Sequence, residues 1–300
     1  MSWYAVETLR RAAVETRELL RPVRAGVWLR LALLAVLAGG TSVRPPGVGL
    51  VTLPLNALGL PSVPDPTLAP RTLAFLAVAL ALGFVASVFE FLLVDFVETD
   101  GGLRRSLGAH ARDGLRLFCF RCCLVVLVVV PLGAFVAGIL AAARDGSAVA
   151  LVLTVVCVPV VGALVVGALA ASALTTSFVV PLMAHGEAGI RSGWRTLRPA
   201  LAAAPDEFGA YLVVRACLGV AYVVAGSIVA GAFALPFALA YGATALGGQA
   251  GALAGVVALA IGAVGAACYL VCLRGPATAY LRSHSLLVLD RLDVPYDYPA

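Results

Sequence analysis

Residues 148–184, AVALVLTVVCVPVVGALVVGALAASALTTSFVVPLMA, contain no charged side chain. A bilayer core about 30 Å thick needs roughly 20 consecutive apolar residues in a helix, so this stretch is long enough to cross a membrane. Other apolar stretches of similar character occur along the chain. We therefore predict an all-α polytopic membrane protein with six transmembrane helices, at residues 27–43, 72–94, 117–142, 148–180, 209–240 and 245–273.

The composition of the 300 residues agrees with this assignment. The chain is 62% hydrophobic and 12% charged, whereas soluble domains are about 45–50% apolar and about 25% charged. These values exclude a soluble enzyme and a disordered protein. The net charge of +5 is small, and we expect no nucleic-acid partner. We also expect no cofactor, because the chain carries no Walker loop, zinc-protease motif or dinucleotide fingerprint.

The positions of the arginines orient the predicted helices. All 21 residues counted as lysine or arginine are arginine, and 18 of them lie in or beside the two terminal segments and the connections after the second and fourth helices. The other three are Arg44, Arg71 and Arg144. Because cytoplasmic loops carry the excess of positive charge, we predict a multi-pass protein of the cell membrane with both termini in the cytoplasm.

Arginine-containing amphipathic stretches precede the odd-numbered helices. Residues 1–26 are predicted to form an interfacial helix under the bilayer. A signal peptide is the less favoured alternative, because these residues are longer than a usual n-region. Similar stretches occupy residues 98–116 and 186–205, and another closes the chain at 275–300. We therefore expect the membrane domain, residues 27–274, to consist of three parallel hairpins with amphipathic cytoplasmic helices between them.

The sixth predicted helix is rich in small residues at four-residue spacing, namely Gly247, Gly251 and Gly255. Such spacing lets helix backbones approach closely. Packing within the chain is the favoured interpretation, and a homo-oligomer formed through this glycine-rich helix is the alternative.

Glu90 is the only acidic residue well inside a predicted transmembrane helix. The second helix runs inward, which places Glu90 about one turn from its cytoplasmic end. Arg30, Arg121 and Arg215 occupy similar depths where the odd-numbered helices begin. A carboxylate in hydrocarbon needs a partner. Two roles remain open: Glu90 pairs with one arginine as a structural lock, or the surplus arginines bind an anion such as a phosphate headgroup at the inner leaflet.

The seven cysteines offer only weak metal-ligand candidates. Cys119 and Cys122 form a C-x-x-C pair, and Cys268 and Cys272 share a helix face. Buried cysteine commonly acts as a small hydrophobe, so we expect neither a metal site nor a disulfide. The three histidines all fall in the amphipathic stretches, where we expect them to be solvated: His110, His185 and His284.

Two neighbouring blocks, SFVVPLM at residues 177–183 and GIRSGWR at 189–195, resemble uncharacterised haloarchaeal multi-pass membrane proteins of unknown function. These uncharacterised proteins are more distantly similar to the membrane region of glycerophosphodiester phosphodiesterases. There, too, a proline ends a long transmembrane helix, and an amphipathic helix precedes the next pair of transmembrane helices. The block YLRSHSLLVL at 280–289 fits the same layout. The resemblance implies a six-helix fold and carries over no catalytic residue, because it does not extend to the soluble catalytic domain.

The sequence favours a non-enzymatic integral membrane protein that is transport-associated or organises the membrane, with the bilayer and its anionic lipids as partners. We assign no catalytic residue. The alternative is a membrane-embedded enzyme or permease that acts on a lipid or a small solute at an inner-leaflet site formed by Glu90 and the arginines.

The topology predicts which side of the membrane each connection faces. An epitope tag inserted after Ser62, in the connection that follows the first predicted helix, should be stained by antibody on intact cells. A tag inserted in the connection near Arg104 should be stained only after permeabilisation. Staining of the Ser62 tag only in permeabilised cells would contradict the six-helix topology.

Overall fold

The computed structural model describes residues 4–21, 24–38, 68–99, 107–145, 148–185 and 189–292. These residues are almost entirely helical and include no β-strand, which confirms the predicted all-α class. The α-helices are α1 (Tyr4–Leu20), α2 (Ala25–Leu37), α4 (Leu68–Glu98), α5 (Leu107–Asp145), α6 (Ala148–Leu174), α7 (Val180–His185), α8 (Ile190–Ala203), α9 (Pro205–Gly242), α10 (Gly248–Cys268) and α11 (Gly275–Arg291). Two π-helical turns, η2 (Thr175–Val179) and η4 (Tyr269–Arg274), and one 3-10 turn, η3 (Ala243–Leu246), join some of them.

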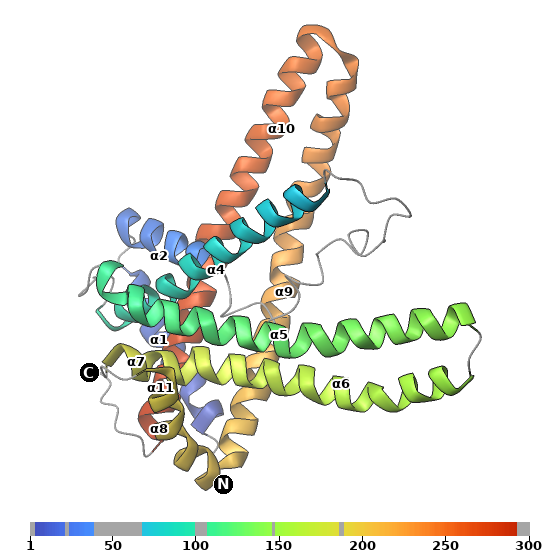
Figure 1. The fold of residues 1–300 in the computed structure, drawn as a ribbon. Helices are drawn as coiled ribbons and strands as arrows, with labels where there is room; N and C mark the ends of the chain where they lie inside the picture. The colour runs from blue at the N-terminus through green and yellow to red at the C-terminus, as the bar shows by residue number, and fades with distance from the viewer. Residues whose placement is uncertain are drawn as a thin grey trace.

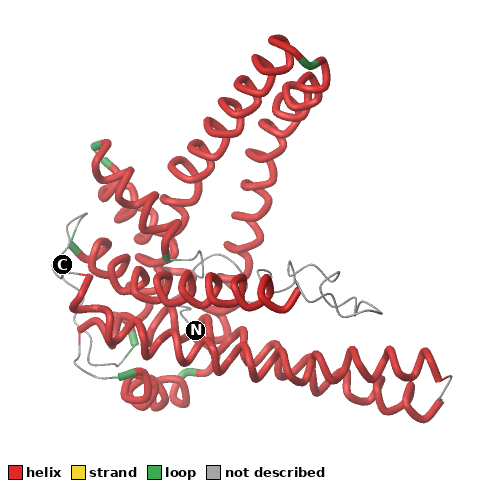
Figure 2. The backbone as a smooth tube through the Cα atoms, turned by 45° about the horizontal axis from the view of Figure 1, so that its top comes forward, coloured by secondary structure: helices red, strands yellow, loops and turns green. Residues whose placement is uncertain are grey.

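The long helices are arranged in pairs that extend outward from a shared region, which we call the base (Figure 1). Helix α5 packs along α6, α9 packs along α10, and α2 packs against α4. The α5–α6 and α9–α10 pairs point in different directions from the base, as both views of the backbone show (Figures 1 and 2). The base contains α1, α7, α8 and α11 together with the nearby ends of α4, α5 and α9. The two long pairs therefore meet at the base rather than along their whole length.

Five helical segments are long and apolar enough to cross a membrane: Leu76–Glu98, His110–Leu140, Val155–His185, Pro205–Leu246 and Gly248–Arg291. They coincide with the second to sixth predicted transmembrane helices. The first predicted helix, 27–43, overlaps α2, whose 13 residues span about 20 Å at 1.5 Å per residue. This helix is shorter than a bilayer core of about 30 Å, so the structure does not confirm a sixth span. Residues 39–43 lie outside the described residues. The described chain is thus that of a multi-span helical protein with five helices of sufficient length.

The projecting parts of the helix pairs expose apolar side chains, whereas the base buries them. Val130, Val166, Ile228 and Leu259 are each more than 60% exposed. Soluble monomers rarely expose contiguous apolar surface of this kind. The outer parts of both pairs therefore fit an apolar solvent.

Small residues bring α10 close to its neighbours in the chain. A Cβ atom at Gly265 would lie 2.8 Å from Cγ of Phe233 in α9, and one at Gly251 would lie 2.7 Å from the carbonyl oxygen of Thr244 in η3. Both distances are shorter than real Cβ contacts, so only glycine allows this approach. Within the described chain, glycines of the sixth predicted helix are used for packing inside the hairpin.

Helix α11 lies within the base and is covered on several sides. It packs against α1 along much of its length and also contacts α2, α4 and η2. The sequence predicted an amphipathic surface segment at 275–300, but α11 buries polar and apolar side chains alike, because neighbouring helices surround it. The buried residues are Gly275, Thr278, Ala279, Leu281, Arg282, Ser283, His284, Ser285, Leu286, Leu287, Val288 and Leu289.

The approach of α4 to α5 gives a packing prediction. A Cβ atom at Gly114 in α5 would lie 2.9 Å from the Cα atom of Val88 in α4, whereas one at Gly133 in the same helix would meet nothing within 4 Å. We expect Gly114→Ala to lower the free energy of unfolding by about 1–3 kcal/mol through overpacking. Gly133→Ala is the matched control, and its helix propensity should leave stability equal or higher. Thermal unfolding in detergent measures both, and equal melting temperatures for the two variants would contradict this packing.

Candidate functional site

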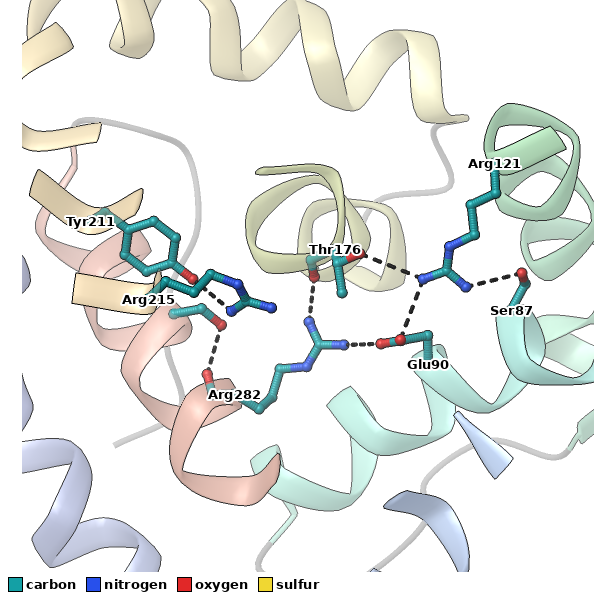
Figure 3. A network of polar contacts seen from close by, with 8 residues as sticks. Ser87, Glu90, Arg121, Thr176, Tyr211, Arg215 and Arg282 are labelled. Carbon is teal, nitrogen blue, oxygen red and sulfur yellow. Dashed lines mark hydrogen bonds and ion pairs between the residues drawn. The ribbon is translucent and has the colours of Figure 1, made fainter. Parts of the chain in front are cut away.

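Glu90 lies where α4 enters the base, and its side chain is fully buried. The outer half of α4 is largely exposed, and continuous burial begins near Ser87, about one helical turn before Glu90. The surrounding polar side chains come from α5, η2, α9 and α11, as Figure 3 shows. The acidic residue that the sequence singled out is thus at the junction between the projecting helices and the base.

Two arginines bind the Glu90 carboxylate, one at each oxygen. Nη2 of Arg282 in α11 lies 2.7 Å from Oε2, and Nη2 of Arg121 in α5 lies 3.3 Å from Oε1. The side chain of Arg282 is 2% exposed and that of Arg121 is 16% exposed. Charge-assisted hydrogen bonds of this kind are stronger than neutral ones. Glu90 is therefore shielded from solvent and held by both cations.

Thr176 adds a third attachment through the π-helical turn η2. Its carbonyl oxygen accepts a hydrogen bond from Nη1 of Arg282, and its hydroxyl oxygen accepts one from Nη2 of Arg121 at 3.5 Å. Nη1 of Arg121 also donates to the Ser87 hydroxyl at 3.1 Å. The π-helical turn thus supplies a backbone carbonyl oxygen as an acceptor for Arg282. Such turns are often found at functional sites.

The network joins chain segments that are far apart in sequence. Glu90 belongs to the first helix pair, and Arg121 and Thr176 belong to the second, whereas Arg282 follows the third. The Glu90–Arg282 contact spans 192 residues. The polar cluster therefore connects all three predicted hairpins at the base.

Arg215 and Arg30 differ from the other predicted site residues. Arg215 in α9 is half-buried and donates from Nη1 to the Tyr211 hydroxyl at 3.1 Å. It lies on the opposite side of Arg282 from Glu90 (Figure 3), close enough for the two positive charges to repel each other. Arg30 is exposed on α2 and is not one of the residues drawn in the network. The structure thus brings Glu90 and Arg121 into contact, whereas Arg215 lies beside Arg282.

Arg282 and Thr176 are the members of the site that sequence reasoning missed. Arg282 is one of the 18 arginines that the sequence analysis assigned to the cytoplasmic side, and Thr176 lies in the uncharged stretch 148–184. The neighbouring Thr175 bonds its own helix, through the carbonyl oxygen of Ala171. The available signal was the placement of Thr278, Arg282 and Ser285 at helical spacing in a leucine-rich segment. This spacing indicates a polar stripe facing other protein.

The histidines also depart from the expectation that they are solvated. His284 stacks on Tyr211 with ring centroids 5.6 Å apart, and its Nε2 lies 2.8 Å from the carbonyl oxygen of Ala5. His110 stacks on Phe91 at 5.9 Å. Both are nearly fully buried, so the expectation was wrong for these two. His185 is more exposed and contacts Glu98 at 3.1 Å.

The cysteines are free thiols, including Cys119, Cys122, Cys268 and Cys272. Among the described residues, no group of three or more histidine, cysteine or acidic side chains is placed to hold a metal ion. A pocket of about 280 Å³ lies between α9 and α10, and its lining includes neither Glu90 nor an arginine. That lining is apolar apart from Tyr269, with Phe233, Phe237 and Gly262 among its residues.

Comparison with known proteins places the chain in a family. Residues 3–299 match the model of a family of unknown function (DUF7544). No curated protein and no solved structure matches the chain. Because the family model covers nearly every residue, including all those of the Glu90 network, this chain belongs to that family of unknown function.

Proposed function

We propose that this protein is a non-enzymatic integral component of the cell membrane, which organises the bilayer or associates with a transport system. In this proposal the base lies at the cytoplasmic face and holds three hairpins in the membrane. The arginine distribution supports this orientation, because positive charge is retained on the cytoplasmic side. The five apolar helices provide the membrane-spanning surface.

The observation that carries a non-enzymatic role is the complete burial of Glu90 between Arg282 and Arg121. An acid or base that acts on a substrate must come within hydrogen-bond reach of it. Here both carboxylate oxygens are already bound by guanidinium groups. The arrangement fits a structural lock better than a substrate site.

The sequence resemblance supports the same conclusion. The membrane regions of the phosphodiesterases, which the sequence resembles distantly, accompany a separate catalytic domain. A fold of this layout therefore suits a membrane-embedded support. The competing function, an enzyme or permease centred on Glu90, would require that carboxylate to become accessible.

Replacement of Glu90 separates the two functions. Glu90→Gln removes the carboxylate that pairs with the buried Arg282 and the partly buried Arg121, so we expect a loss of about 3–5 kcal/mol in unfolding free energy. The double variant Glu90→Gln with Arg282→Gln should recover part of this loss, because it removes opposite charges together. Thermal unfolding of the detergent-solubilised protein measures both effects.

Glu18→Gln, at an exposed position on α1, is the control and should leave stability within about 0.5 kcal/mol. A Glu90→Gln protein of wild-type stability that has lost ligand or lipid retention would contradict the structural role and support the enzyme or permease.

A further inference from the structure

We propose that the pocket between α9 and α10 holds one hydrocarbon chain of a bilayer lipid, which comes from the leaflet away from the base. The pocket has a volume of about 280 Å³ and is lined by residues of α9 and α10 together with Tyr269 of η4. This inference rests on the proposed membrane placement of the hairpins and goes beyond it by naming a bound lipid. It does not depend on the Glu90 network, whose residues do not line the pocket.

Large and small side chains alternate around the pocket. Phe233 and Phe237 lie about one turn apart on α9 and reach across to glycines of α10. A Cβ atom at Gly265 would lie 2.8 Å from Cγ of Phe233, and one at Gly262 would lie 3.4 Å from Cε2 of Phe237. Small lining residues lie beside these rings, namely Ala230, Ala234 and Ala266. The rings therefore fill the space between the helices only in part, and the alanines leave the remainder open.

Tyr269 bounds the pocket on the side of the base. Its ring lies over Gly226 of α9, where a Cβ atom would be 3.2 Å from Cε2 of Tyr269, and its hydroxyl is hydrogen-bonded to that of Tyr222. Both α9 residues precede Val229, so this contact is nearer to the base than the pocket is. From Val229 to Phe237, α9 rises about 12 Å at 1.5 Å per residue. The pocket is thus a short apolar slot that ends at a pair of tyrosines.

The lining and the width of this slot exclude water and a third helix. A buried water needs about two to four polar partners, whereas the lining is apolar apart from Tyr269. A helix with its side chains is about 10–12 Å across, and α9 already touches α10 where Phe233 meets Gly265. An empty slot would lose the dispersion contacts of its walls. A hydrocarbon chain has the required chemistry and width, and it is the solvent that the exposed apolar faces of this hairpin fit.

The position of the pocket along α9 indicates which leaflet supplies the chain. Tyr211 is buried in the base and Val213 is 63% exposed, so the apolar part of α9 begins near this point. Val229 lies about 24 Å beyond Val213 at 1.5 Å per residue, which is more than half of a hydrocarbon core of about 30 Å. The pocket therefore lies in the leaflet away from the base, which is the outer leaflet in the proposed orientation. A chain that enters at Phe237 ends near Tyr269.

Photo-crosslinking in a bilayer tests the proposal. The full chain is reconstituted into phosphatidylcholine vesicles that contain a small fraction of phosphatidylcholine with a diazirine in one chain. Mass spectrometry of peptides then locates the adducts. Adducts on the exposed surface of α6, at residues such as Val166, report contact with bulk lipid and serve as the internal reference. We expect adducts at Phe233 and Phe237 in the wild type.

Filling the pocket should remove these adducts. Ala266→Leu should lower the yield at Phe233, relative to the α6 reference, by roughly fivefold or more, because extra methyl groups overpack a filled site. Ala263→Leu makes the same substitution at an exposed position of α10 outside the lining and should change the yield by less than about twofold. An unchanged yield in Ala266→Leu, or an equal loss in Ala263→Leu, would overturn the proposal. If Ala266→Leu does not fold, as judged by thermal unfolding, Ala234→Leu fills the pocket from α9 and should give the same loss.

The position of the diazirine along the lipid chain tests the direction of entry. A diazirine near the terminal methyl group should label the Val229 end of the pocket, and one near the glycerol should label Phe237. The reverse order would overturn the assignment to the leaflet away from the base.

A side chain from a second copy of the protein is the alternative occupant. Native mass spectrometry measures the oligomeric state, which we expect to be the same in the wild type and in Ala266→Leu. A wild-type dimer that Ala266→Leu converts to a monomer would overturn the lipid assignment. Glu90→Gln should lower stability without changing the adduct yield at Phe233 per folded molecule, so the structural lock and the lipid pocket fail independently.

Discussion

A carboxylate with no access to water is the constraint on which the rest of this fold depends. Ionised Glu90 cannot be buried without opposite charge, because transfer of an isolated carboxylate into an apolar medium is very costly. Arg282 and Arg121 provide that charge, and each makes a further hydrogen bond through Nη1, to Thr176 and to Ser87 respectively. The network therefore fixes the positions of α4, α5, η2 and α11 relative to one another. Apolar packing alone would hold these helices less selectively, since many registers bury similar area.

The base and the projecting helices differ in which side chains they bury and which they expose. In the base, α11 is surrounded by protein, and polar side chains such as Ser283 and His284 are almost fully buried beside leucines. On the projecting α9–α10 pair, close packing occurs at the contact between the partner helices, where Gly265 meets Phe233. The opposite faces remain apolar and exposed. The base resembles a small soluble core, and the hairpins are suited to lipid.

Sequence reasoning reached the helical class, five of the long apolar helices and the need of Glu90 for a basic partner. These follow from length, composition and the cost of a charge in hydrocarbon, which are local properties. The Glu90–Arg121 contact was also among the expected pairs, because both residues lie at similar depth. The role of Arg282 could not be predicted in this way. Its spacing from Thr278 and Ser285 indicates a polar stripe on one helix, but it does not show which other helix that stripe contacts. The exposure of Arg30 and the burial of His110 and His284 depend in the same way on how helices pack.

The 192 residues that separate Glu90 from Arg282 also set an order of events during synthesis. Chains grow at about 5–20 residues per second, so roughly ten to forty seconds pass between the appearance of the acid and that of its tighter partner. Arg121 follows Glu90 by only 31 residues and is available to it during this interval. A chain that stops before α11 retains its apolar hairpins but lacks the second cation. Helix α11 thus completes the charge balance of a residue made much earlier, and closure of the base requires that synthesis has passed Arg282.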